Sequence, residues 1–275
     1  MARRIIISIV LTLLLLTAAR RLSTGRQADL MSEEQGLRVY HRTVTEIVGP
    51  GQPSLKAKIE PVQRAALVVR WISPPSSEIQ ARGMWEIKKG IYEAYFPALE
   101  KGTKIKYWIT ASNVVGTKVR VPKDPEKFGV LRYKGKASNF VVGAHVVFMF
   151  GAFFFMVMSF LAAIEILRGR EDKTNAVRAA RLVLASSFIG GWPLGFLLNY
   201  QTFGTLWEGF PFGYDVTDNK TQVIFILWLV SLFLAWGSFI GRGEEKDRLG
   251  RKAFALAIVA CFVISLALFV LPHSI

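Results

Sequence analysis

Two histidines, His145 and His273, are the residues of this chain whose type and spacing could do chemistry inside an apolar environment. His145 lies near the start of the apolar run 140–167, and His273 follows the apolar run 253–271. If these runs are the first and last of four antiparallel membrane helices, both imidazoles lie at the same depth. Imidazole is a common axial ligand of haem iron, and helical bundles are usual cofactor sites. The pair therefore predicts a haem b site held by His145 and His273.

Three other roles of the two histidines stay open from sequence: a copper or zinc site, a proton or quinone-headgroup role, and a structural role. Met149 lies one helical turn from His145 and can assist a metal or cofactor there. Lys220, at the end of the preceding polar segment, can pair with a haem propionate or a lipid phosphate.

Other catalytic patterns do not occur in the sequence. It has no Ser-His-Asp arrangement, no phosphate-binding loop and no HExxH motif. The single cysteine, Cys261, excludes an internal disulfide and a Cys-x-x-Cys-His haem attachment. We therefore do not expect a stand-alone enzyme.

Long apolar runs must position the histidines. A helix needs about 20 apolar residues to cross the ~30 Å hydrocarbon layer of a membrane. Residues 140–275 are thus predicted to form a four-helix transmembrane domain, with helices at about 140–167, 182–200, 222–240 and 253–271. A shorter run follows Arg3 and Arg4, which predicts a signal anchor or a signal peptide over residues 1–21.

Basic residues are concentrated in two of the three loops between these runs. Cytoplasmic loops of membrane proteins carry an excess of Lys and Arg. The loop 201–220 has one basic residue, Lys220, whereas the loops 168–181 and 241–252 carry Arg168, Arg170, Lys173, Arg178 and Arg181, and Arg242, Lys246, Arg248, Arg251 and Lys252. This pattern predicts that the latter two loops are cytoplasmic, and that residues 22–139 and the C-terminus lie on the outer side.

Residues 22–139 are predicted to form an exported β-sandwich. In 103–112, Ile105, Tyr107 and Ile109 alternate with more polar neighbours, which is the period of a half-buried strand. About eight short strands with regular turns are typical of a sandwich. The predicted strands are 37–47, 54–60, 66–72, 83–87, 91–96, 103–112, 117–122 and 128–133. The stretch 92–122 resembles immunoglobulin-like or fibronectin type III modules, which implies positioning or binding rather than catalysis.

The exported part is strongly basic. Residues 20–139 contain 22 Lys and Arg against 11 Asp and Glu, a net charge of +11. Such a surface attracts an acidic partner or anionic lipid headgroups. Outside the membrane, nucleic acid is not an expected partner.

The segment 207–221 has an unusual composition for a connector between apolar runs. Four aromatic residues suit a membrane interface, and Gly and Pro enforce turns. Asp residues then cap a helix that we expect to begin near residue 219 or 220. We predict an ordered lid over the mouth of the bundle, formed by Trp207, Phe210, Phe212, Tyr214, Asp215 and Asp218.

Three stretches together carry a resemblance: 142-VGAHVVFMFGAFF-154, 207-WEGFPFGYDVTDNKT-221 and 271-LPHS-274. They resemble a family of uncharacterised bacterial inner-membrane proteins that have an exported immunoglobulin-like domain before four membrane helices. The resemblance implies the bacterial inner membrane, with the β-domain and C-terminus on the periplasmic side, and brings no activity.

Two functions follow as expectations. The first is a membrane subunit of a respiratory or electron-transfer complex, which binds haem b and contacts other membrane or exported subunits. The alternative is a cofactor-free envelope scaffold or accessory subunit, whose basic β-domain binds protein or lipid.

Overall fold

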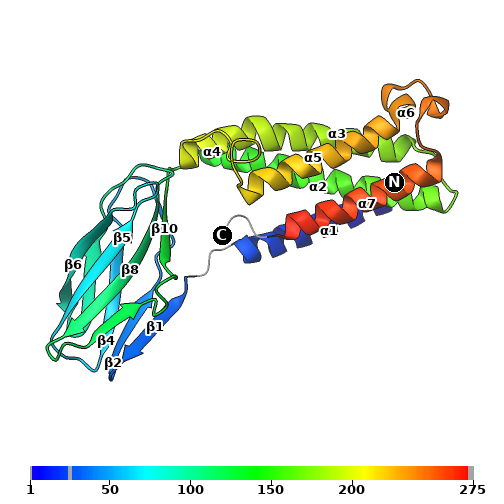
Figure 1. Ribbon diagram of the computed structural model, residues 1–275. Coiled ribbons are helices and arrows are strands. Elements are labelled where there is room, and N and C mark those ends of the chain that lie inside the picture. Colours follow the sequence, from blue (N-terminus) through cyan, green and yellow to red (C-terminus); the bar gives the residue numbers. More distant parts are fainter. Residues whose placement is uncertain (1, 24–26, 272–275) are drawn as a thin grey trace. The chain divides into compact units, whose positions relative to one another are not determined.

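A computed structural model describes residues 2–23 and 27–271 (Figure 1). The chain forms two compact units. The β-domain comprises Gly25–Lys136 together with Gln201–Gly204, and the helical unit comprises the remaining residues. The expected order, a β-domain followed by helices, is confirmed.

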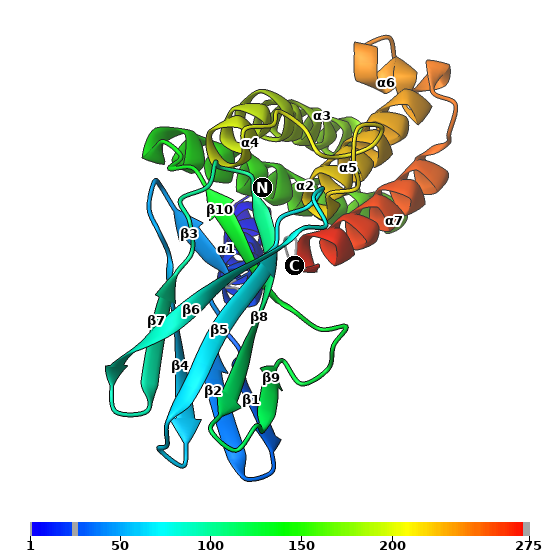
Figure 2. The same ribbon diagram turned by 60° about the vertical axis from the view of Figure 1, so that its left-hand side comes forward.

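The β-domain is one curled sheet of ten strands (Figure 2). The strands are β1 (Asp29–Glu34), β2 (Leu37–Arg42), β3 (Glu46–Val48), β4 (Ser54–Glu60), β5 (Ala65–Ile72), β6 (Ile79–Lys88), β7 (Ile91–Tyr95), β8 (Lys104–Asn113), β9 (Lys118–Val121) and β10 (Gly129–Lys134). Their order is β1-β2-β4-β7-β6-β5-β8-β10-β3, with β9 paired to β8. Strand β6 pairs with β5 through Met84 and with β7 from Trp85 onward, so it joins the two halves of the sheet. Every described pairing is antiparallel except that of β10 with β3.

Alternating apolar residues from both halves fill a single core. In β8, Ile105, Tyr107 and Ile109 are buried, as the alternation predicts. The predicted run 37–47 is divided into β2 and β3, and β1 was not predicted. Strand β1 has one buried residue, Ser32, so it lacks the apolar alternation by which a strand is recognised.

His41 lies in this core, and its role was not foreseen from sequence. Its Nδ1 lies 2.8 Å from the Lys56 carbonyl oxygen, which can only accept, so Nδ1 carries the proton. Its Nε2 therefore accepts from the Tyr107 hydroxyl at 3.0 Å. The Val44 N–H donates to that hydroxyl at 3.0 Å. Burial lowers the pKa of His41 and raises the pKa of Tyr107 to about 12, so both groups are neutral near pH 7.

We expect the β-domain to lose stability on acidification because of His41. The unfolded chain binds a proton near the ordinary pKa of about 6.5, whereas the folded domain resists it. The contribution of neutral His41 to the stability is therefore fully present above about pH 6.5. Below that pH the free energy of unfolding falls, by at most about 1.4 kcal/mol per pH unit. Hydrogen-exchange protection of the Ile109 amide, corrected for intrinsic exchange, measures this loss. A His41→Gln variant should show no such slope, and an equal slope in both proteins would contradict the assignment.

The segment Gln201–Gly204, which includes the last residues of helix α4 (Gly195–Phe203), completes the β-domain. Gly135 donates its N–H to the Thr202 carbonyl oxygen at 2.7 Å. The Arg132 guanidinium lies 3.8 Å from the centre of the Phe203 ring. Gly102 has φ +90°, and a Cβ there would collide with the Phe203 carbonyl oxygen. Glycine is therefore required at position 102 both for its backbone conformation and for this close approach.

The helical unit contains α1 (Ala2–Ser23), α2 (Asn139–Leu167), α3 (Thr174–Ile189), the π-helical turn η1 (Gly190–Leu194), α4 (Gly195–Phe203), α5 (Val216–Leu234), α6 (Trp236–Ile240), the 3₁₀ turn η2 (Glu244–Lys246) and α7 (Arg251–Val270). Within the described residues, three helical segments are long and apolar enough to cross a membrane: 139–167, 174–203 and 251–270. This length and composition are typical of a membrane protein.

Two helix boundaries differ from those predicted. The second segment begins at Thr174, so Arg178 and Arg181 belong to a helix and not to a loop. The helix predicted at 222–240 begins at Val216, as α5, and is interrupted at Ala235, whose φ of −109° and ψ of 44° depart from helical values. The predicted first residues of both helices were too late in the sequence. They were chosen from apolar content alone, whereas each helix begins with one or two polar turns.

Aromatic and small side chains form the core of the helical unit. The largest fully buried residues include Phe153, Trp228 and Phe254. Trp228 Nε1 donates to Ser265 Oγ at 3.0 Å, which satisfies the buried indole between α5 and α7. Leu15 of α1 belongs to the same core, so the N-terminal helix packs as part of the unit.

Candidate functional site

His145 is held against the irregular turn of the second helical segment. Its Nδ1 donates to the Gly190 carbonyl oxygen at 2.9 Å. Gly190 opens the π-helical turn η1, where Pro193 lacks an N–H and the regular bonding of the helix is interrupted. Because the carbonyl can only accept, the proton lies on Nδ1 and Nε2 carries the lone pair. Metal-binding histidines commonly have this arrangement, with Nδ1–H on a backbone carbonyl.

The glycines of η1 allow close helix packing. A Cβ at Gly190 would lie 3.0 Å from the Met149 Sδ of α2. A Cβ at Gly191 would lie 2.5 Å from Thr221 Cγ2 of α5. Both glycines are buried, so α2 and α5 fill the space beside this turn. Met149 therefore packs against Gly190 on the same turn that His145 contacts.

The other two predicted cofactor residues have different outcomes. His273 lies outside the described residues. Lys220 is buried, and its Nζ donates to the Leu271 carbonyl oxygen at 2.9 Å. Leu271 is the C-cap of α7, and a cation at a helix C-terminus is favourable. Lys220 thus ties the start of α5 to the end of α7.

Asp218 holds the segment 205–215, which we call the aromatic loop. Its carboxylate is buried and accepts the Glu208 N–H at 2.8 Å. The Asn199 amide donates to both of its oxygens at 3.2 Å. Asp215 is the N-cap of α5 and accepts from Thr217 N at 2.8 Å. Asp218, predicted as a cap, therefore joins three parts of the chain instead.

The aromatic side chains of this loop divide into one that packs and three that project. Trp207 stacks on Trp192 with ring centres 6.0 Å apart and 14° between the planes. By contrast, Phe210, Phe212 and Tyr214 are 63%, 82% and 91% exposed. Of the predicted lid residues, Trp207 packs against Trp192 and Phe196 of the helices, whereas the other three aromatic residues are exposed.

A buried ion pair at another part of the unit was not foreseen. Lys173 Nζ donates to Asp247 Oδ2 at 2.8 Å, and the two side chains are 2% and 0% exposed. The backbone N–H and the hydroxyl of Ser238 donate to Asp247 at 2.7 and 2.6 Å. Burial raises the pKa of Asp247, but the hydrogen bonds from Lys173 and Ser238 outweigh it and lower the pKa overall. Both charges lie in short charged loops, which by sequence alone resemble solvated connectors.

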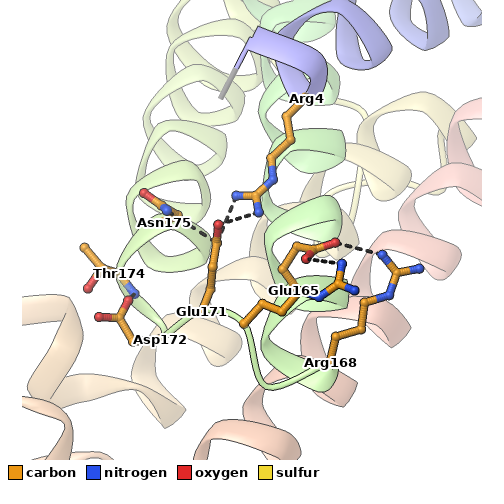
Figure 3. A network of polar contacts seen from close by, with 8 residues as sticks. Arg4, Glu165, Arg168, Glu171, Asp172, Thr174 and Asn175 are labelled. Atoms are coloured by element: carbon orange, nitrogen blue, oxygen red, sulfur yellow. Dashed lines mark hydrogen bonds and ion pairs between the residues drawn. The ribbon is translucent and has the colours of Figure 1, made fainter.

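The loop between α2 and α3 carries further ion pairs (Figure 3). Glu165 accepts from Arg168 at 2.8 Å, which accounts for an acidic residue near the end of an apolar helix. The Arg4 guanidinium of α1 binds both Glu171 oxygens, at 2.9 and 2.5 Å. Its hydrogen bonds lower the pKa of Glu171. Arg4 therefore ties α1 to this loop.

Within residues 2–23 and 27–271, no three His, Cys, Asp or Glu side chains are grouped as a metal site would need. No family model matches the chain, and no curated protein matches it. One structural similarity is to Astrotactin-2, described as a conserved vertebrate-specific and perforin-like membrane protein involved in neuronal development. The identity is 8% and the TM-score 0.22, and the match covers 82% of this chain and 39% of that one. A similarity this weak carries no functional argument.

Proposed function

We propose that this protein is a membrane-embedded accessory subunit that binds an exported partner protein through its aromatic loop and its basic β-domain. The exposure of Phe210, Phe212 and Tyr214 on a fixed loop carries the proposal. Exposed apolar patches mark interaction sites, and Phe, Tyr and Trp are enriched in the buried centres of protein interfaces. Because Asp218 and its neighbours already order the loop, binding costs little conformational entropy.

The β-domain supports an acidic partner. Several of its lysines are exposed, among them Lys88, Lys89, Lys104, Lys106 and Lys118. Complementary charge accelerates encounter and selects partners, and its effect falls as salt rises. We therefore expect the partner to present an acidic surface and to be released more readily at high ionic strength.

The membrane setting is part of the proposal. It comprises four membrane spans, an immunoglobulin-like β-domain and the bacterial inner membrane, with the β-domain and the aromatic loop on the periplasmic side. The basic residues in and around the loop before α3 and the loop before α7 support this orientation by the positive-inside rule. Packing of Leu15 and the pairing of Arg4 with Glu171 support α1 as an anchor that is retained.

Photo-crosslinking from the aromatic loop tests the proposal. A photoreactive phenylalanine analogue at position 212 should give a discrete protein adduct in intact cells. Serine at positions 210, 212 and 214 together should abolish co-purification of that partner and leave thermal stability unchanged, because these side chains make few contacts within the chain.

A second function, an electron-transfer subunit that binds haem b, is favoured by one observation. His145 donates through Nδ1 and leaves the Nε2 lone pair free for a metal. One histidine of the predicted pair therefore fits an axial ligand, and a haem held there would supply one-electron redox chemistry. Met149 and Lys220 fit it less well, because each already packs against or bonds to the chain itself.

A reduced-minus-oxidised visible spectrum of the gently purified protein separates the two functions. The accessory function predicts a flat spectrum. The haem function predicts a b-type signal that is lost in His273→Ala and in His145→Asn. Asparagine at position 145 can still donate to the Gly190 carbonyl through its amide, so loss of the signal there would reflect ligation and not packing.

A further inference from the structure

A cavity of about 420 Å³ lies between the first three helices of the helical unit. Its size falls within the range of ligand pockets, roughly 300–1,000 Å³. Helix α1 contributes Arg4 and Ile5, and α2 contributes Phe154, Phe155 and Met158. The remaining wall comes from α3 and the residues before it. That wall consists of Glu171, Asn175, Arg178, Ala179 and Leu182.

One side of this cavity is charged. Arg4 is paired with Glu171, which also accepts from the Asn175 amide at 3.3 Å, so these charges offset one another. Arg178 lies three residues beyond Asn175 in α3 and is exposed. Of the described residues, none forms a hydrogen bond or a close ion pair with Arg178. It is therefore the cation of this cavity that is available to a ligand.

Acidic neighbours do not remove this positive charge. Besides Glu171, the carboxylate of Asp172 lies close to Arg178. It accepts the Thr174 N–H at 2.9 Å (Figure 3). Arg251 also lies near enough to stabilise the ionised Asp172. Asp172 is thus shared between the start of α3 and two arginines, and Arg178 keeps capacity for an anion.

The opposite side of the cavity is apolar and open. Phe154, Phe155 and Met158 are half-buried along one face of α2, toward the end that carries Glu165 and Arg168. Ile5 and Leu182 are exposed at the rim. A ligand that fits must therefore combine an anionic group with an apolar chain. It must enter the cavity from the lipid side of the helices.

We propose that this cavity binds an anionic phospholipid, with its phosphate at Arg178 and an acyl chain along Ile5, Phe155 and Leu182. Basic pockets between membrane helices on the cytoplasmic side are suited to anionic headgroups. The Arg4–Glu171 pair fixes α1 as one wall, so the site exists only while α1 is bound to the unit. The inference needs the helical unit to lie in a bilayer, and it is independent of the docking function.

Native mass spectrometry of the full chain released from nanodiscs tests this proposal. With phosphatidylglycerol in the bilayer, the protein should retain bound lipid, whereas phosphatidylcholine should be lost. Arg178→Gln should weaken retention about fivefold, the effect of roughly one basic residue near a membrane surface. Leu182→Trp, which fills the rim without a change of charge, should weaken it as well.

The matched control is Arg248→Gln, which removes an exposed arginine that lies against the Phe233 ring, away from the cavity. It should retain phosphatidylglycerol as the unchanged protein does. Equal retention of both lipids, or equal loss in Arg178→Gln and Arg248→Gln, would overturn the proposal. Displacement of the lipid by soluble glycerol phosphate would also overturn it, since the headgroup alone would then account for binding.

Discussion

Asp247→Ala is expected to destabilise the helical unit by about 3–5 kcal/mol, because it leaves a buried cation without its partner. Lys173 and Asp247 are both removed from solvent, and Asp247 also accepts both donors of Ser238. In the variant the Lys173 ammonium keeps its hydrogen bond to the Leu249 carbonyl but loses its counter-charge, and the Ser238 N–H and hydroxyl lose their acceptor. The loss should appear as a large fall in the thermal unfolding midpoint in detergent, or as failure to accumulate in the membrane.

Two further variants separate the pair from its surroundings. Lys246→Ala removes an exposed charge from the same loop and should change stability little. The double variant Lys173→Met with Asp247→Leu removes both charges and should recover part of the stability, as apolar replacement of buried ion pairs often does. If Asp247→Ala unfolded at the same temperature as Lys246→Ala, the buried pair could not be structural.

Asp218→Ala is expected to disorder the aromatic loop, at a cost of about 1–3 kcal/mol for the buried donors that lose their acceptor. The Glu208 N–H and the Asn199 amide both depend on this carboxylate. Hydrogen exchange of residues 205–215 should accelerate strongly, while the amides of α2 keep their protection. Any partner bound by the loop should be lost with this order.

The comparison with Asp215→Ala makes this result specific. Asp215 caps α5 but does not receive the Glu208 N–H, so its removal should cost about 1 kcal/mol and fray the helix start only. Asp218→Asn keeps an acceptor for the Glu208 N–H. Its loss of stability should therefore lie between those of Asp218→Ala and Asp215→Ala. Loop exchange that is unchanged in Asp218→Ala would show that aromatic packing of Trp207 alone orders the segment.

Local patterns predicted the secondary structure where burial follows a simple period. The alternation of Ile105, Tyr107 and Ile109 marks β8, because one face of a strand lies in the core. Strand β1 escaped prediction since it pairs at the sheet edge and buries only Ser32. The helix starts at Thr174 and Val216 escaped for a similar reason, because their first turns are polar.

Buried polar pairs could not be predicted, because each depends on a neighbour distant in sequence. Lys173 meets Asp247 and Lys220 meets Leu271 only once the helices have packed. The same holds for His41, whose tautomer is set by the Lys56 carbonyl and the Tyr107 hydroxyl. From the sequence alone, a charged residue in a loop cannot be assigned to solvent or to a buried contact with a distant part of the chain.

The most direct test of the docking function is photo-crosslinking in intact cells from position 212, whose side chain is 82% exposed. Leu229, on the apolar helix α5, provides the control position, where we expect adducts with lipid only. The docking function predicts one discrete protein adduct from position 212 that is absent from position 229. Lipid adducts alone from both positions would contradict it, and would make the aromatic loop a membrane anchor.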